Sequence, residues 1–270
     1  MKEFDFYIVP TPIGNLGDIT NRAIETLKTV DVIACEDMRV TQKLLNHFDI
    51  KTKCISYHKF NEKERLDSFL EIIKSGKKMA LVSDAGTPLF CDPGAILVEE
   101  LRKNNVSVTA LPGANALVTF LSQVPRDSEE FTFVGFLPKT KSQVLDVLKK
   151  SKKNDIIFYE SPNRLMNTLE IISEYNPNSK VAIGRELTKV FEEVVIDDIE
   201  NVIKHFKENL LKGEIVGMVY KSCVNDDNLD LDEKIELLMT KNFKAKEISL
   251  ILSTLYDLNK NEVYERIIKK

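Results

Sequence analysis

The sequence predicts an α/β protein made of two α/β domains and a small helical C-terminal segment. Short apolar runs alternate with amphipathic stretches through the first two-thirds of the chain, a pattern typical of a mainly parallel sheet with helices on both faces. A second series of strand-like and helical stretches begins near residue 120, and an acidic stretch at 225–230 precedes three short amphipathic helices. We therefore expect an N-terminal domain at residues 1–119, a second domain with a mixed sheet at 120–224, and a linker with the helical segment at 225–270.

The first domain is expected to contain four strands where apolar and β-branched residues cluster, at residues 6–10, 30–35, 79–83 and 106–111. Asp18 is expected to cap the first helix, because apolar residues follow it at helical spacing. Asn61 is expected to start a later helix that Gly76 ends, and Pro93 to lie in the first turn of the next one.

The second domain is expected to contain strands at residues 131–136, 155–160, 181–186 and 214–220 and helices at 141–150, 162–174 and 199–211. Residues 192–196 are expected to pair back on the strand before them, which would make the sheet mixed. The C-terminal helices are expected at residues 231–240 and 244–256, with a third from Asn261.

Composition excludes several classes of protein. The chain has 270 residues, of which 43% are hydrophobic and 30% charged, with a net charge of −4, so a dedicated basic nucleic-acid binder is disfavoured while a local basic patch stays open. No uncharged apolar run is long enough to span a bilayer, and the first residues lack the layout of a signal peptide. We expect a cytoplasmic protein that does not enter the membrane.

The cysteines and histidines predict neither a disulfide framework nor a metal site. The four cysteines form no CxxC pair, and the histidines share no metal-ligand spacing with them. These residues are Cys35, Cys54, Cys91, Cys223, His47, His58 and His205. The chain also lacks a GxGxxG and a GxxxxGK[ST] motif, which disfavours the common dinucleotide fold and a P-loop nucleotide-binding site.

Three turn-rich loops follow expected strands, at residues 11–17, 84–88 and 112–115. Each loop alone is more simply explained as an ordinary βα turn. Ligands of open α/β sheets bind beyond the carboxyl ends of the strands, so three such loops together indicate a small-molecule site. Pro12 stiffens the first loop and Gly14 permits close approach, while Asp84 and Thr87 add a carboxylate and a hydroxyl.

Charged and aromatic clusters at other strand ends have two interpretations. Arg39 belongs to the cluster at 36–39, which could lie at the mouth of a cleft or simply begin a helix. The segments 158–162 and 184–189 place charges directly after buried strands, where either a functional site or a surface ion pair could account for them. The Tyr57–Asn61 segment could stack on a nucleobase, although a structural role is the simpler account.

The chain resembles the ribosomal RNA small subunit methyltransferase I family of the tetrapyrrole methylase superfamily. The resemblance rests on ordered blocks along the first 195 residues or so, beginning with PTPIGNLGDIT at residues 10–20. The other blocks are EDMRVT (36–41), SYH (56–58), LVSDAGTP (81–88), DPG (92–94), LPGA (111–114), GFLP (135–138), FYESP (158–162) and RELTK (185–189).

The resemblance implies two α/β domains of the tetrapyrrole methylase type with S-adenosylmethionine held in the cleft between them, usually in a homodimer. It implies 2′-O-methylation of a cytidine ribose in the decoding region of 16S rRNA, with small-subunit rRNA or the assembled small ribosomal subunit as partner. Relatives that modify tetrapyrroles usually carry a Gly-Asp-Pro loop where this chain has residues 83–88, which favours the RNA branch. A small-molecule or tetrapyrrole methyltransferase and a non-catalytic ribosome-assembly factor remain alternatives.

Candidate site residues follow from the matched blocks. Glu160 and Glu186 are the expected acceptors of the hydroxyl proton, and Arg39 and Lys189 their cationic partners. Small residues and polar anchors are expected to bind the cofactor, namely Pro12, Gly14, Asp84, Ala85, Gly86, Thr87, Pro112, Gly113, Ala114, Tyr159, Glu160 and Ser161. The family commonly has His where this chain has Asn163, so an imidazole base at that position is not expected.

Overall fold

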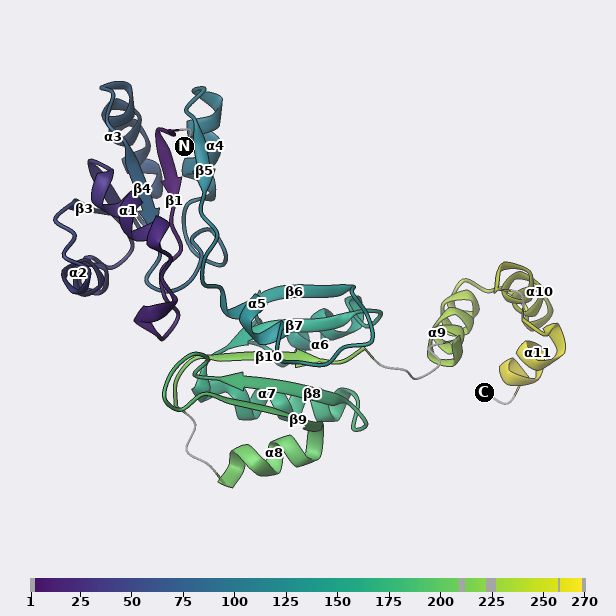
Figure 1. The fold of residues 1–270 in the computed structure, drawn as a ribbon. Helices are drawn as coiled ribbons and strands as arrows, with labels where there is room; N and C mark the ends of the chain where they lie inside the picture. Colours follow the sequence, from purple (N-terminus) through teal and green to yellow (C-terminus); the bar gives the residue numbers. More distant parts are fainter. Residues whose placement is uncertain (1–2, 209–211, 222–226, 257, 269–270) are drawn as a thin grey trace. The chain divides into compact units, whose positions relative to one another are not determined.

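The computed structural model describes residues 3–208, 212–221, 227–256 and 258–268. The chain divides into two compact units, Met1–Lys221 and Ser222–Lys270 (Figure 1). Cys223, the expected linker residues 225–226 and the expected helical residues 209–211 lie outside the described residues. In the described part of the chain, no helix has the length and apolar character that crossing a membrane requires.

The first sheet of the larger unit is entirely parallel. It contains β1 (Phe6–Ile8), β2 (Val32–Cys35), β3 (Lys53–Ser56), β4 (Met79–Val82) and β5 (Val108–Ala110), in the order β3-β2-β4-β1-β5. Every residue of β2 and β4 is buried, as continuous apolar runs in the middle of a parallel sheet require. β3 was not predicted, because its residues are half-buried or exposed and carry no apolar run.

Helices cover both faces of this sheet, as predicted. They are α1 (Asn21–Thr29), α2 (Met38–His47), α3 (Glu62–Lys74) and α4 (Ala95–Lys103). Leu27 and Leu45 of α1 and α2 pack on one face, and Phe69 and Leu97 of α3 and α4 pack on the other. The period-two alternation of side chains along the strands supplies one apolar cluster to each face.

Two of the expected helix starts are wrong. Thr20, not Asp18, caps α1 by accepting a hydrogen bond from Ala23 N at 3.1 Å, while Asp18 lies in a short 3₁₀ turn. Pro93 lies ahead of α4, which begins after Gly94. Gly94 has φ 134°, and a Cβ there would come within 2.8 Å of the Leu81 side chain, so the chain turns at this glycine before the helix can start.

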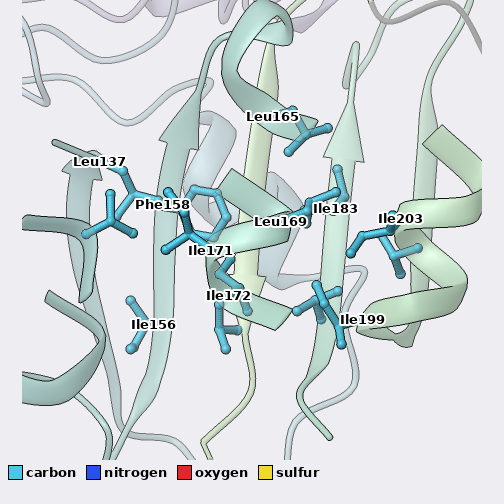
Figure 2. Packing of buried hydrophobic residues seen from close by; sticks show 14 of the residues in the cluster. Leu137, Ile156, Phe158, Leu165, Leu169, Ile171, Ile172, Ile183, Ile199 and Ile203 are labelled. Carbon is cyan, nitrogen blue, oxygen red and sulfur yellow. The ribbon is translucent and has the colours of Figure 1, made fainter. Parts of the chain in front are cut away.

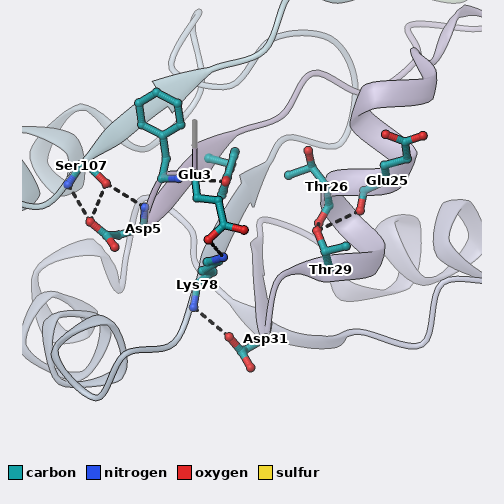
Figure 3. A network of polar contacts seen from close by, with 10 residues as sticks. Glu3, Asp5, Glu25, Thr26, Thr29, Asp31, Lys78 and Ser107 are labelled. Carbon is teal, nitrogen blue, oxygen red and sulfur yellow. Dashed lines mark hydrogen bonds and ion pairs between the residues drawn. The ribbon is translucent and has the colours of Figure 1, made fainter. Parts of the chain in front are cut away.

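A network of polar contacts lies at the end of the first sheet where β1 and β5 begin (Figure 3). The Asp5 carboxylate accepts hydrogen bonds from the backbone and the hydroxyl of Ser107, at 3.0 and 2.5 Å. These bonds lower the pKa of Asp5 below its usual value. Lys78 pairs with Glu3 at 2.7 Å, and its backbone N–H donates to Asp31 at 2.8 Å, so the starts of β1, β2, β4 and β5 are tied together.

The second sheet is mixed, as expected. It contains β6 (Phe131–Phe136), β7 (Asp155–Glu160), β8 (Lys180–Arg185), β9 (Glu193–Asp198) and β10 (Ile215–Val219), in the order β6-β7-β10-β8-β9. Only the β6–β7 pairing is parallel among these strands. The expected return of the chain on β8 is confirmed, because β9 pairs with β8 along its whole length.

Helices α6 (Lys141–Lys150), α7 (Pro162–Tyr175) and α8 (Ile199–Glu208) cover one face of the second sheet. Figure 2 shows the packing there, where Leu169 lies among isoleucines of the strands and of α7. The short helix α5 (Ala116–Leu121) packs Leu117 and Phe120 on the opposite face. α5 was not predicted, since six residues show too little periodicity to distinguish a helix from a loop.

The smaller unit contains α9 (Asp227–Thr240), α10 (Ala245–Tyr256) and α11 (Lys260–Ile268) around their own apolar core. Arg266 of α11 pairs with Asp232 of α9 at 2.7 Å. The sequence placed the start of the first helix at residue 231, but α9 begins at Asp227. Residues 227–230, read as part of the acidic linker, therefore form the first turn of α9.

Leu169→Ala tests the core of the second sheet. Leu169 is fully buried, and we expect its truncation to lower the free energy of unfolding by about 2–5 kcal/mol, because the side chain leaves a cavity. Urea denaturation followed by circular dichroism measures the change. Leu16→Ala removes the same atoms from a side chain that is 41% exposed and is expected to cost much less. Equal losses in the two variants would contradict this account of the core.

Candidate functional site

A cavity of about 470 Å³ lies in the larger unit at the carboxyl ends of the parallel strands. Four segments that follow strands of the first sheet contribute to it, after β1, β2, β4 and β5. The ends of β6 and β7, the segment after β8 and the start of β10 complete the walls. The volume falls in the range of small-molecule sites, about 300–1,000 Å³, and the position is the one expected for an open α/β sheet.

The three predicted loops meet at this cavity. Thr11 and Gly86 exchange two backbone hydrogen bonds of 2.9 Å each, which joins the first loop to the second. The Thr87 hydroxyl donates to the carbonyl of Ala114 at 3.0 Å, which joins the second loop to the third. Several expected site residues line the cavity, namely Asp84, Ala85, Gly86, Thr87, Tyr159, Glu160 and Ser161.

The other expected residues of the first and third loops do not line the cavity. A Cβ on Gly14 would come within 2.4 Å of Lys189 Cγ, and one on Gly113 within 2.6 Å of Pro10 Cβ. These glycines therefore permit close approach of protein to protein. Their neighbours Ile13 and Asn115 line the cavity, whereas Pro12, Gly14, Pro112, Gly113 and Ala114 do not.

Three carboxylates, those of Glu36, Asp84 and Asp92, form an acidic wall of the cavity. Burial and the neighbouring Glu36 and Asp84 raise the pKa of Asp92 to about 6. Burial and the charge of Asp84 also raise the pKa of Glu36, and burial raises that of Asp84. A positively charged ligand would stabilise these mutually repelling carboxylates, because each of them would then have an opposite charge nearby.

Arg39 lies beside this wall and pairs with Asp37. The guanidinium contacts the Asp37 carboxylate at 2.6 Å, while 89% of the Arg39 side chain is exposed. The hydrogen bonds from Arg39 lower the pKa of Asp37 to about 2. The backbone N–H of Asp37 donates to Asp84 at 3.1 Å, so the start of α2 also holds the acidic wall in place.

Glu160 has a buried carboxylate whose two oxygens already have partners. One oxygen accepts the backbone N–H of Ser161 at 2.8 Å, and the other accepts the Thr168 hydroxyl at 2.9 Å. Arg164 lies 3.2 Å from the second oxygen and donates to the backbone carbonyl of Leu137. Glu160 thus connects the end of β7 to α7 and to the segment after β6.

Glu186 and Lys189 form an ion pair of 2.7 Å, and Lys189 also approaches Glu214 at 3.2 Å. Burial opposes the charge of Glu186, but the hydrogen bonds from Lys189 and from the backbone of Glu214 outweigh it and lower the pKa of Glu186. The carboxylates of Glu186 and Glu214 raise the pKa of Lys189, although its burial acts to lower it. Of this cluster, Glu214 lines the cavity.

The backbone beside the cavity is strained at several residues other than glycine. Leu89 and Cys91 have φ of 68° and 74°, and Glu186 and Thr188 have φ of 52° and 64°. Left-handed conformations cost about 1–3 kcal/mol each and persist where the surrounding contacts determine them, often at functional sites. The strain lies in the two segments that carry Asp92 and the Glu186–Lys189 pair.

The sequence missed part of the cavity. Glu36 and Asp92 lie in matched blocks, but their alignment with Asp84 appears only once the parallel strands are assembled. Phe136 also lies in such a block, and its orientation depends on an irregularity of β6. The sequence contained no indication that the start of β10 lines the cavity, because the antiparallel pairing of β10 with β7 brings it there. The residues concerned are Gly213, Glu214, Ile215 and Val216.

In the described residues, no group of three or more His, Cys, Asp or Glu side chains could hold a metal ion.

Comparison with known proteins defines the class. The family model described as "Tetrapyrrole (Corrin/Porphyrin) Methylases" matches residues 5–203. A solved structure of uroporphyrin-III C-methyltransferase from Thermus thermophilus, complexed with S-adenyl homocysteine, covers 79% of this chain and 96% of its own, with a TM-score of 0.56 and 16% identity. The chain belongs to the tetrapyrrole methylase family, and it is a methyltransferase of that fold.

Within this family, curated relatives named ribosomal RNA small subunit methyltransferase I match the chain over nearly its full length. The protein of Buchnera aphidicola (subsp. Acyrthosiphon pisum) is 41% identical, over 98% of this chain and 96% of the relative. The protein of Rickettsia prowazekii is 39% identical over the same shares. The chain groups with these relatives inside the family.

Gly14→Ala tests the contact between the first loop and the segment after β8. We expect a loss of about 1–3 kcal/mol of unfolding free energy, because the added methyl meets Lys189 Cγ at 2.4 Å and the Leu187 carbonyl at 2.9 Å. Urea denaturation measures the loss. Gly17→Ala is the matched control, since a Cβ there meets only the Asn15 side chain, at 3.2 Å. An unchanged midpoint for Gly14→Ala would show that this contact is not tight.

Proposed function

We propose that the protein transfers a methyl group from S-adenosylmethionine to the 2′-hydroxyl of a cytidine ribose in the decoding region of 16S rRNA. The observation that carries this proposal is the acidic cavity in a chain that matches ribosomal RNA small subunit methyltransferase I relatives over 98% of its length. We further propose that it acts in the cytoplasm as a homodimer on small-subunit rRNA or the assembled small subunit.

The cavity fits S-adenosylmethionine by size and by charge. This cofactor carries its methyl group on a cationic sulfonium, which makes the methyl an electrophile. Glu36, Asp84 and Asp92 supply negative charge, and the small residues Ala85 and Gly86 leave backbone accessible to a ligand. The related fold complexed with S-adenyl homocysteine supports the same type of ligand. We propose that Thr87, Tyr159 and Ser161 add polar contacts.

Asp92 is the carboxylate that we propose as the proton acceptor. It lines the cavity, and its pKa of about 6 leaves it mostly ionised at neutral pH yet basic enough to take a proton from the ribose hydroxyl as the hydroxyl attacks. Glu160 and Glu186, which the sequence favoured for this role, already accept hydrogen bonds from protein groups. We propose that these two carboxylates position the cavity walls.

Positioning is the other contribution of this chain. Lys189 holds Glu186 and Glu214 together at the edge of the cavity, and Pro12, Gly14, Pro112, Gly113 and Ala114 support the loops that line it. Arg39 presents an exposed guanidinium beside the acidic wall, where a phosphate of the RNA could pair with it. Holding the hydroxyl and the methyl in line accounts for a large part of the rate enhancement.

A transfer assay tests the function directly. The purified protein is incubated with radiolabelled S-adenosylmethionine and either unmodified small ribosomal subunits or naked small-subunit rRNA. We expect label in an alkali-resistant dinucleotide that contains cytidine, because a 2′-O-methyl group blocks alkaline cleavage. Asp92→Asn is expected to lower kcat by about 10²–10⁴-fold.

Other results of the same assay would overturn the proposal. Label that alkali releases as a mononucleotide would indicate base methylation. No transfer to either RNA, with cofactor binding intact by calorimetry, would favour a tetrapyrrole substrate, as the family description allows. No cofactor binding at all would favour a ribosome-assembly factor.

The acidic wall predicts a pH dependence of cofactor affinity. Protonation of Asp92 below about pH 6 removes a negative charge that attracts the cation, so the Kd for S-adenosylmethionine should rise as the pH falls from 7 to 5. Isothermal calorimetry across this range measures it. In Asp92→Asn the change near pH 6 should disappear, because the carboxyl that titrates there is absent. A Kd that is constant from pH 7 to 5 in the wild type would contradict this prediction.

A further inference from the structure

Phe136 is an aromatic side chain at the cavity that remains largely open to solvent. It lines the cavity, yet 61% of it is exposed. The GFLP block that contains it, at residues 135–138, has no part in the proposed function so far. A large apolar ring that the fold leaves exposed at a cavity is available to a ligand.

An irregularity of β6 turns this ring toward the cavity. Phe133 pairs with Ile157 and Phe136 pairs with Tyr159. Between these two pairs β6 therefore contains one residue more than β7. Phe133 packs on the α5 face of the sheet and Val134 on the face that α6 to α8 cover. Regular alternation would place Phe136 on the same face as Val134, and the extra residue returns it to the face of Phe133.

Gly135 makes this bulge possible. It has φ 65°, a left-handed conformation, and a Cβ there would lie 3.3 Å from the Cys91 sulfur. Both the backbone angle and the space favour glycine. Bulges are common next to active sites, where they redirect a side chain.

Neighbouring side chains hold the Phe136 ring in place. It meets Tyr159 edge to face, with ring centroids 5.7 Å apart and planes at 63°. Tyr159 in turn meets Phe133 at 5.1 Å, and Phe133 stacks on Phe90 at 4.9 Å. An edge-to-face contact with one neighbour leaves a π-face of Phe136 available for stacking.

The backbone after Phe136 is fixed as well. Arg164 donates hydrogen bonds to the carbonyls of Leu137 and Pro138, at 2.9 and 2.5 Å. The buried Glu160 carboxylate holds Arg164 at 3.2 Å. This arrangement gives Glu160 a positioning role for the rim of the cavity, through Arg164.

We propose that Phe136 is the stacking platform for the nucleobase of the nucleotide that is methylated, which leaves its own base stack to reach the cavity. This inference rests on the proposed function. Aromatic side chains stack on unpaired bases in sequence-specific RNA recognition, and enzymes that modify nucleotides commonly take them out of the stack.

Exposure favours a base of the RNA over the cofactor's adenine, and charge decides which part of the RNA nucleotide can enter. The carboxylates of Glu36, Asp84 and Asp92 repel phosphates, so the neutral base and ribose are the parts of a nucleotide that can enter. A small cofactor is expected to be 70–90% buried by its site, whereas Phe136 lies at the open rim. The exposed Phe136 ring is therefore accessible to a base of the RNA that enters the cavity from solvent.

Phe136→Leu and Phe136→Tyr test the platform. Initial transfer rates are measured against the concentration of unmodified small subunits at saturating cofactor, and the cofactor Kd is measured by calorimetry. We expect Phe136→Leu to lower kcat/KM for the subunit by about ten-fold or more, because stacking is lost while an apolar side chain remains. Phe136→Tyr should retain kcat/KM within about three-fold, and the cofactor Kd should stay within about two-fold in both variants.

Phe131→Leu is the matched control, since Phe131 begins the same strand and is 39% exposed, away from the cavity. Wild-type kcat/KM in Phe136→Leu would overturn the stacking role and leave the proposed function intact. A weakened cofactor Kd with an unchanged KM for the subunit would show that the ring serves the cofactor's adenine, which also overturns it. Absence of transfer by the wild-type protein would remove the proposed function and this inference together.

Discussion

The backbone pairing of Thr11 with Gly86 is the constraint on which the cavity depends. Its two hydrogen bonds of 2.9 Å hold the loop after β1 against the loop after β4, and the Thr11 hydroxyl adds a bond to the Ser83 carbonyl at 3.0 Å. Because β1 and β4 are adjacent and parallel, their loops emerge at the same edge and can pair. Thr87 extends the connection to the loop after β5, so three separate βα turns behave as one wall.

The two sides of the cavity differ in how their charges are used. On the second-sheet side, Glu160 and Glu186 are neutralised by Arg164 and Lys189, and these pairs fix the backbone. On the first-sheet side, Glu36, Asp84 and Asp92 face one another, and the pKa of each is raised. Carboxylates with a perturbed pKa in a cleft indicate a functional site, because the fold gains nothing from leaving them in mutual repulsion.

Much of the candidate site could be read from the sequence, because loops after parallel strands converge wherever the strands do. That reasoning expected Asp84 to Thr87 and Tyr159 to Ser161 at one site, and in the structure these residues line one cavity. It favoured Glu160 and Glu186 as reactive groups because both end a buried strand, but a sequence does not reveal which partners a carboxylate meets. Gly14 illustrates the same limit, since its close neighbour is Lys189, 175 positions later by residue number.

By itself the sequence determined the fold class and most of the regular elements, because the period of apolar residues decides whether a segment buries one face as a helix or both faces as a central strand. The loops of small and polar residues that follow the strands also indicated where the site lies. Only the tertiary structure decided which side chains face the cavity. Asp92 and Glu36 line the same cavity because β4 and β2, the strands that precede them, are parallel neighbours. Phe136 faces the rim because one extra residue in β6 reverses the alternation. Such orientations depend on contacts between distant segments, which local periodicity does not record.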